Sequence, residues 1–393
     1  MPKTILRASN RLVPLEAYRG IAAFIVLVHH FFLAFSPYTM GILPTVRNAE
    51  SLIGQPYFAI FNGTGAVGFF FTLSGFVLCW SYFHHEDQKK LLLAFLKRFP
   101  RLVAIVTVTT IASYFLFKLN LYYFREASEL TSSPWLAAFA FGLTPDFEPV
   151  FLKALFQGVT TFFTGAANYN TNLWTMKPEF FGSMIVYMLA CFISVILGHR
   201  HLLYALAVIS ISALFYNDLI FPFVVGAFLS ASLAKRKSEV RFLTSIGLIV
   251  LGLYLLGYML PEKSYIVFSV LPHSVMEHSQ TLFHTLGSIC IIFATMSNRT
   301  IFNSLNGRFF AGIGKISFPL YLVHTLIICS LSSYAYIRLM SNGFSNPTSL
   351  TIVFAVTAVT SITLAVPLSR FDDWWVKRVD SGIRGLFNKN DEL

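Results

Sequence analysis

Long apolar runs alternate with short polar segments along most of the chain. A membrane-spanning helix needs roughly 20 mainly apolar residues. Runs near that length lie at residues 17–36, 61–82, 100–118, 179–197, 201–216, 218–234, 242–260, 279–296, 316–336 and 350–369. The pattern predicts an all-α, multi-pass integral membrane protein of about ten transmembrane helices.

The composition supports a membrane environment. Of the 393 residues, 55% are hydrophobic, only 12% are charged, and 42 are Phe. A soluble domain carries about a quarter charged residues because its surface must face water. Most side chains of this chain are therefore expected to face lipid or other helices.

The net charge of +11 has two explanations, nucleic acid binding or the excess of Lys and Arg on the cytosolic side of membrane proteins. If the chain begins inside, 22 of its 29 Lys and Arg residues fall in cytosolic segments. This distribution predicts that both termini are cytosolic, and it explains the charge without nucleic acid. In a bacterium the protein would lie in the inner membrane.

The predicted helices form one domain, residues 1–375, followed by a short cytosolic tail, residues 376–393. The longest polar stretch, residues 119–178, falls on the outer side and is long enough to form a lid or an acceptor-binding cap. All four Cys residues lie inside apolar runs, where a thiol behaves as a small apolar side chain. We therefore expect no disulfide and no metal site.

Ionisable side chains inside a membrane are energetically costly, so each is a candidate for function. Arg19 and His30 are eleven residues apart in the first run, which in a helix is about three turns and about 16 Å on one face. His29 points about 80° away from that face. His30 would lie near the membrane middle and Arg19 at its cytosolic edge. A packing hydrogen bond is the alternative explanation for a lone membrane histidine.

The second run contains Gly65, Gly68 and Gly75. Small residues at this spacing let helices approach closely, and close packing is the explanation that we favour. Ser74 in the same run has the chemistry of a nucleophile, but the sequence shows no adjacent base.

The third run begins with basic residues around a proline, Arg98, Pro100 and Arg101. Proline suits the first turn of a helix, so the two arginines are predicted to flank a helix N-terminus on the cytosolic side. Backbone donors and two guanidinium groups would suit a phosphate. The alternative is that they only belong to the cytosolic charge excess.

Two further spans carry candidate residues. Glu179 falls in the first turn of the fourth span, at the outer face, where a carboxylate also has the simpler role of opposing the helix dipole. Ser317, Tyr321 and His324 share one face of the ninth span, with His324 near mid-membrane. Two mid-depth histidines, a basic cytosolic mouth and an outer acid are difficult to explain by packing alone.

With these residues in place, the chain resembles the membrane acyltransferase-3 family of envelope polysaccharide O-acyltransferases. The resemblance covers nearly the whole length and rests on LEAYRG followed by His30, GAVGFFFTLSGFVL, Arg98-x-x-Arg101-Leu102, Leu173-Trp174-Thr175 with Glu179, and Tyr321-Leu322-x-His324. One departure is visible: family members often carry a proline shortly after the second arginine, whereas Pro100 precedes it here.

The resemblance implies an enzyme that moves an acyl group from a cytosolic acyl-CoA, expected to be acetyl-CoA, to a sugar hydroxyl. The acceptor would be a lipid-linked or cell-envelope glycan, as in lipopolysaccharide O-acetylation. The expected partners are acyl-CoA, a carbohydrate or glycolipid and membrane lipid. His30 would be the general base, since imidazole titrates near neutral pH, and His324 would join it in the catalytic group.

The resemblance also implies a division between donor and acceptor sides. Arg98 and Arg101 would hold the CoA phosphates, with Tyr321 in the same donor-binding group. Arg19 would anchor the donor or orient the site, and Glu179 would act on the acceptor side. Direct transfer and a covalent acyl relay both remain open. The main alternative function is a proton-coupled secondary transporter that uses the buried histidines as a relay, and a third is a non-catalytic sensor or scaffold.

Overall fold

The computed structural model describes residues 12–139, 148–236 and 238–390. Helices joined by short connections make up this part of the chain, and it contains no strand. The all-α prediction is therefore confirmed for the described residues. The basic start of the chain, residues 140–147 of the long connection and the last three residues of the predicted tail lie outside them.

The described helices group into two compact units. The first unit comprises Met1–Ala22, Gly54–Leu96 and Pro178–Lys315. The second comprises Ala23–Ile53, Lys97–Lys177 and Ile316–Leu393. The prediction of a single domain over residues 1–375 stays a prediction.

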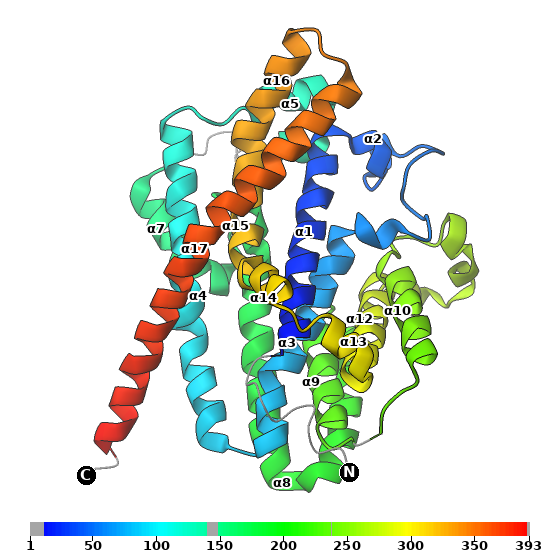
Figure 1. Ribbon diagram of the computed structural model, residues 1–393, viewed down its shortest axis with the longest axis vertical. Helices are drawn as coiled ribbons and strands as arrows, with labels where there is room; N and C mark the ends of the chain where they lie inside the picture. Colours follow the sequence, from blue (N-terminus) through cyan, green and yellow to red (C-terminus); the bar gives the residue numbers. More distant parts are fainter. Residues whose placement is uncertain (1–11, 140–147, 237, 391–393) are drawn as a thin grey trace. The chain divides into compact units, whose positions relative to one another are not determined.

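The first unit contains the start of α1 (Val13–Phe35) and the 3₁₀ turn η2 (Phe58–Ile60). It continues with α3 (Gly63–His85), most of α8 (Met176–Tyr216), α9 (Phe221–Ala234), α10 (Phe242–Leu256), η4 (Lys263–Val270), α11 (His273–Met276), α12 (Ser279–Ser297), α13 (Arg299–Ser304) and α14 (Arg308–Lys315) (Figure 1). A Cβ on Gly75 of α3 would overlap the carbonyl of Phe223 of α9. Glycine therefore allows these two backbones to touch, as its spacing predicted.

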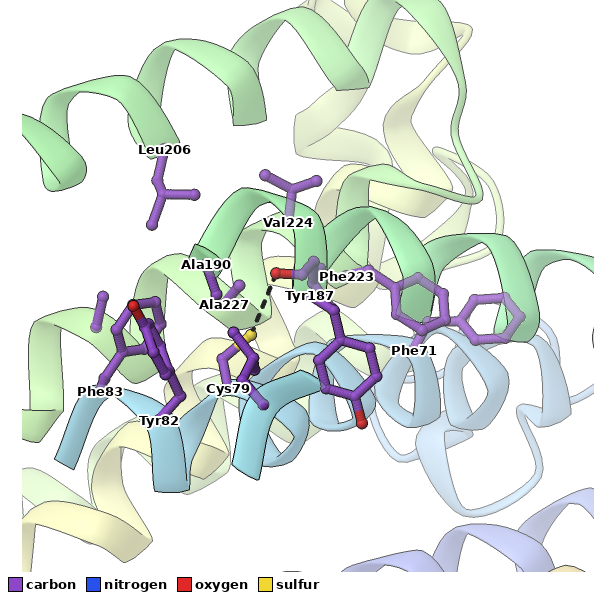
Figure 2. Packing of buried hydrophobic residues seen from close by; sticks show 13 residues of the cluster. Phe71, Cys79, Tyr82, Phe83, Tyr187, Ala190, Leu206, Phe223, Val224 and Ala227 are labelled. Atoms are coloured by element: carbon purple, nitrogen blue, oxygen red, sulfur yellow. Dashed lines mark hydrogen bonds between the residues drawn. The ribbon is translucent and has the colours of Figure 1, made fainter. Parts of the chain in front are cut away.

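The core of the first unit lies between α3, α8 and α9, as Figure 2 shows. The rings of Phe71 and Phe223 stack with centroids 5.0 Å apart. The Cys79 thiol is fully buried and donates to the carbonyl of Val186 over 3.7 Å. It is a free thiol used in packing, in line with its place in an apolar run.

The second unit contains the rest of α1 and the longest C-terminal helices. Its elements are α2 (Pro37–Met40), η1 (Pro44–Val46), α4 (Gln88–Lys118) from Lys97 onward, α5 (Phe124–Thr131), α6 (Pro134–Ala137), α7 (Phe151–Thr164), η3 (Thr171–Thr175), α15 (Ser317–Ile327), the π-helical turn η5 (Ile328–Ser332), α16 (Ser333–Ser341) and α17 (Asn346–Asn390). Its buried core includes Phe31, Phe124, Leu326 and Tyr336.

Several helices are suited to a membrane. Within the described residues, five are long and apolar enough to cross one: Val13–Phe35, Gly63–His85, Ser279–Ser297, Ser317–Ser341 and Asn346–Gly385. Shorter apolar helices cover Ala205–Leu214, Phe221–Ala234 and Phe242–Leu256. The apolar helices are consistent with a membrane protein, and the count of ten spans stays a prediction.

The start of α4 corrects one prediction. The helix begins at Gln88, so Pro100 lies inside it, and Arg98 and Arg101 do not flank a helix N-terminus. The cause is a cap that the apolar pattern did not reveal. Asp87 accepts a hydrogen bond from the backbone N–H of Lys90 over 3.0 Å, the usual interaction of a helix N-cap. This bond, helped by the Lys90 side chain, lowers the pKa of the Asp87 carboxyl.

Two other boundaries differ from the prediction. Runs 179–197 and 201–216 belong to one helix, α8, because Gly198, His199 and Arg200 between them include no proline to end it. Likewise α17 continues to Asn390 and takes up the described part of the predicted tail. Both predicted helix ends were placed where polar residues interrupt an apolar run. Polar residues alone do not terminate a helix.

The connection over 119–178 is largely helical. α7 lies along α4: Phe151 contacts Tyr114, Gly158 faces Thr107, and Phe162 contacts Phe99. The opposite face of α7 is apolar and exposed, with Leu152 and Phe156 both 69% accessible. After α7 the chain turns at Gly165, whose φ of 76° suits glycine, and returns to α15.

Candidate active site

The two predicted mid-membrane histidines meet in the second unit. His30 of α1 and His324 of α15 are 294 residues apart in sequence, and their Nδ1 and Nε2 atoms are 2.8 Å apart. The ring planes differ by only 14° with centroids 5.1 Å apart. A 2.8 Å contact between nitrogens of nearly coplanar rings is a hydrogen bond in the ring plane. His324 is fully buried, and His30 is half-buried.

The backbone of α15 determines the direction of this hydrogen bond. The other nitrogen of His324, Nδ1, lies 3.0 Å from the carbonyl oxygen of Leu320. A carbonyl can only accept, so Nδ1 carries a proton. A charged imidazolium is costly in a buried position, so Nε2 of His324 is a lone-pair acceptor. His30 must then donate from Nδ1, and in the neutral ring its own Nε2 is unprotonated and able to accept a proton.

Buried amide side chains of η3 and the residue before it hold α15 on both sides of His324. Asn172 donates to the carbonyl of Tyr321 over 2.6 Å, and Asn170 donates to that of Leu322 over 2.7 Å. Thr325 donates to the side-chain oxygen of Asn170 over 3.0 Å. Because His324 lies between these anchors, its ring has little freedom to move away from His30.

Tyr321, predicted as a donor-binding residue, takes part in the same network. Its hydroxyl lies 2.9 Å from Thr175 Oγ1 and 3.3 Å from the carbonyl of Asn172. The helical spacing that placed Tyr321 on the face of His324 is confirmed, with ring centroids 6.0 Å apart. In the structure its hydroxyl helps to fix η3 to α15.

Two further aromatic rings surround His30. The indole of Trp135 in α6 stacks on it, with centroids 5.0 Å apart and planes 20° apart. His29 is buried, and its ring lies 5.5 Å from that of His30 at 64°.

Arg19 is half-buried on the same α1, which is continuous from Val13 to Phe35, so Arg19 and His30 keep the predicted helical spacing.

The first unit holds a second polar pair. Ser74 of α3 donates to Oε1 of Glu179 over 2.9 Å. Ser74 is 4% exposed, and Glu179 lies in the first turn of α8, as predicted. The sequence left Ser74 without a neighbouring base, and the fold supplies a carboxylate.

The basic segment of α4 packs against the C-terminal part of α17. Arg98 is buried, Arg101 is exposed, and Lys97 forms an ion pair with Asp380. Asp380 also accepts from Arg384 over 2.8 Å. The carbonyl of Pro100 accepts from the indole N–H of Trp375 over 2.6 Å. The two predicted phosphate-binding arginines therefore lie beside acidic and aromatic residues of α17, within a helix rather than at its start.

Comparison with known proteins identifies the protein family. A family model described as an acyltransferase domain matches residues 14–366, almost the entire chain. The chain belongs to this acyltransferase-3 family. Among curated proteins and solved structures, nothing matches it.

Membership makes the protein an acyltransferase and a transferase, and it confirms the resemblance seen in the motifs. It gives no support to the transporter alternative. The matched region contains all seven predicted site residues: Arg19, His30, Arg98, Arg101, Glu179, Tyr321 and His324. No group of three or more His, Cys, Asp or Glu side chains in the described part of the acyltransferase could hold a metal ion.

Sequence reasoning missed three contacts of the candidate residues: Trp135 against His30, the Asn170 and Asn172 anchors of the helix that carries His324, and the carboxylate partner of Ser74. Only the asparagines left a signal, two amides that flank Thr171 just before an apolar helix. Buried amides must find partners, and here the partners are carbonyls of a helix 149 to 152 residues away.

Proposed function

We propose that this acyltransferase transfers an acyl group, which we infer to be acetyl, from a cytosolic acyl-CoA to a hydroxyl of a cell-envelope or lipid-linked carbohydrate. The observation that carries the proposal is the in-plane contact of His30 and His324. It leaves one unprotonated nitrogen, His30 Nε2, on a partly accessible ring. A neutral imidazole with a fixed tautomer is suited to general base catalysis.

In the proposed reaction, the proton of the sugar hydroxyl passes to His30 Nε2 as its oxygen attacks the thioester carbonyl. The new C–O bond forms, the C–S bond breaks, and the departing CoA thiolate takes the proton from His30. His324 accepts the Nδ1–H of His30 throughout, as the carboxylate does in a Ser-His-Asp triad. This route is direct transfer, without an acyl-enzyme.

The donor would enter from the cytosolic side. Arg98 and Arg101 would bind its phosphates through their side chains, since guanidinium groups pair well with phosphate oxygens. Lys97 in the same segment is paired with Asp380, so the proposal assigns the phosphates to the two arginines. Arg19 would anchor the donor along α1, and Tyr321 would contribute to donor binding through its ring.

The acceptor would bind on the outer side, near Glu179. This assignment uses the proposed topology of ten crossings with both termini cytosolic, which the distribution of 22 of 29 basic residues supports. In a bacterium this would be a multi-pass protein of the inner membrane that modifies glycans such as lipopolysaccharide.

The proposal is tested with purified protein, labelled acetyl-CoA and a carbohydrate acceptor. His30→Ala should slow transfer on the order of a hundredfold or more, the usual contribution of a general base. His29→Ala is the matched control, since it removes the same kind of ring one residue away and should slow transfer far less. Near-normal transfer by His30→Ala would exclude this role.

An experiment in cells identifies the acceptor. Mass spectrometry of envelope glycans from a deletion strain and its parent should show the loss of one acyl group per modified sugar. Complementation with His30→Ala should not restore it, and complementation with His29→Ala should. Identical glycans in the two strains would contradict a carbohydrate acceptor while leaving the acyltransferase class intact.

A further inference from the structure

Two side chains contact the His30 ring, one at its edge and one on its face. His324 contacts it in the ring plane through one nitrogen. Trp135 lies parallel to it, at 5.0 Å and 20°. At that separation two nearly parallel rings without a hydrogen bond between them are offset-stacked. The indole therefore covers part of the imidazole face and does not interrupt the hydrogen bond to His324 in the ring plane.

The position of Trp135 is tied to the helix that carries His30. Ser133 precedes α6 and caps it by accepting from the backbone N–H of Leu136 over 3.1 Å. The same hydroxyl donates to the carbonyl of Leu33, three residues after His30 in α1, over 2.6 Å. One side chain thus fixes α6 to α1, and Trp135 follows directly after Pro134 in the first turn.

The chemistry of a general base gives the stacking a function. Before reaction the His30 ring is neutral, and it becomes an imidazolium when Nε2 takes the proton of the sugar hydroxyl. A cation within about 6 Å of an indole centroid is attracted by the negative face of the ring, and the attraction is stronger away from water. A neutral imidazole gains far less. An interaction that strengthens as charge develops lowers the barrier rather than only binding the ground state.

We propose that Trp135 is a positioning residue that acts through His30, holding the ring on α1 and stabilising its protonated form during acyl transfer. The proposal rests on the proposed role of His30 as base. The titratable groups facing His30 in the described residues are His29 on α1 and His324 on α15. The four residues of α6 include no charged side chain. Trp135 is therefore the ring on which the charged form of His30 stacks.

The experiment compares Trp135→Leu and Trp135→Phe with the wild type at saturating acetyl-CoA and acceptor. Trp135→Leu should lower kcat on the order of tenfold with little change in KM. The acid limb of its kcat–pH profile should move to lower pH, because the protonated His30 ring is less stable without the indole. Trp135→Phe, with a weaker ring face, should fall between the two. Trp374→Leu is the matched control: this indole is 51% exposed and stacks on Arg378 in α17, and its loss should leave kcat and the profile unchanged.

A purely structural role predicts a different result. It would lower the unfolding temperature and the amount of active protein, with the acid limb unmoved, and that outcome would overturn the proposal. If Trp135→Leu fails to fold, fluorinated tryptophans placed at position 135 keep the shape of the ring while weakening its negative face. The logarithm of kcat should then fall with each added fluorine, and a flat series would equally overturn the proposal. Absence of any transfer by the wild type would instead remove the proposed function itself.

Discussion

Ser74 Oγ donates a hydrogen bond to Glu179 Oε1, although 105 residues separate them. A serine inside a helix commonly donates to a carbonyl one turn earlier, and here it bonds a carboxylate of another helix. The bond gives the partly buried Glu179 a donor and Ser74 a base. The pair therefore supplies a nucleophile and a base for a covalent relay, whereas in the direct transfer proposed above only the Glu179 carboxylate takes part, on the acceptor side.

Substitution at both positions distinguishes these two uses of the pair. Glu179→Gln keeps an acceptor for Ser74 but removes the charge, and under the proposed function it should lower transfer about tenfold or more with little loss of stability. Ser74→Ala should lower stability by about 1.5–3 kcal/mol, the value of a hydrogen bond to a charged group, and reduce transfer less. Labelled acetyl-CoA without acceptor should leave no acyl group on the protein. A labelled Ser74 peptide in mass spectrometry would establish the relay instead.

Much of the helical framework could be predicted from the sequence because lipid-facing and packed helices need long apolar runs. α1, α3 and α12 begin and end within a few residues of their predicted bounds. The start of α4 could not be predicted in the same way, because four of residues 88–99 are Lys or Arg and the cap depends on the one carboxylate of Asp87. Apolar content identifies the buried part of a helix, whereas caps and breakers set its ends.

The candidate site was only partly predictable for a different reason. Spacing within one helix placed Arg19 with His30 and Tyr321 with His324, since both pairs follow from 3.6 residues per turn. The contact between His30 and His324 spans 294 residues, and no local pattern encodes it. Trp135 lies in a four-residue helix whose sequence gives no sign of its neighbour.

The tautomer of His30 depends on His324, which gives a direct prediction. His324→Phe keeps a ring of similar shape but cannot accept the Nδ1–H of His30. It should lower kcat on the order of a hundredfold or more and change KM little, as expected when a base loses its orienting partner. His324→Gln, whose side-chain oxygen can accept, should recover part of the activity. Steady-state kinetics with thermal unfolding check this, and full activity of the Phe variant would show that His30 needs no partner.

The packing of α7 on α4 gives a stability prediction. A Cβ on Gly158 would lie 2.6 Å from Thr107 Cα, which forces the helices apart, whereas a Cβ on Gly247 of α10 meets nothing within 4 Å. Gly158→Ala should therefore destabilise the protein by about 1–3 kcal/mol. Gly247→Ala should be neutral or stabilise it by up to about 1 kcal/mol, because alanine favours a helix. Thermal unfolding in detergent compares them, and equal shifts would contradict the observed packing.

The continuity of α8 makes the topology testable at one point. Ten crossings require the chain to turn back near Arg200, inside the range that α8 covers. Reporter fusions at Arg200 and Lys235 should then read cytosolic, and fusions at Asn217 and Lys153 should read external. If α8 crosses only once, Arg200 and Asn217 will report the same side, and the number of crossings will be lower than proposed.

The proposed donor site has fewer phosphate-binding groups than the sequence suggested. Without a helix N-terminus at Pro100, the phosphates of acyl-CoA would depend on the Arg98 and Arg101 side chains alone. Each charge-assisted hydrogen bond contributes about 1.5–3 kcal/mol, so Arg98→Ala with Arg101→Ala should weaken acetyl-CoA binding more than tenfold. Lys97→Ala is the matched control: it removes a neighbouring cation whose partner is Asp380, and it should weaken binding less than threefold. Direct titration of labelled acetyl-CoA against folded, detergent-solubilised protein measures all three. Equal affinity in the double variant and the wild type would move the donor site away from α4, whereas equal losses in the double variant and Lys97→Ala would indicate a general effect of positive charge rather than a phosphate site.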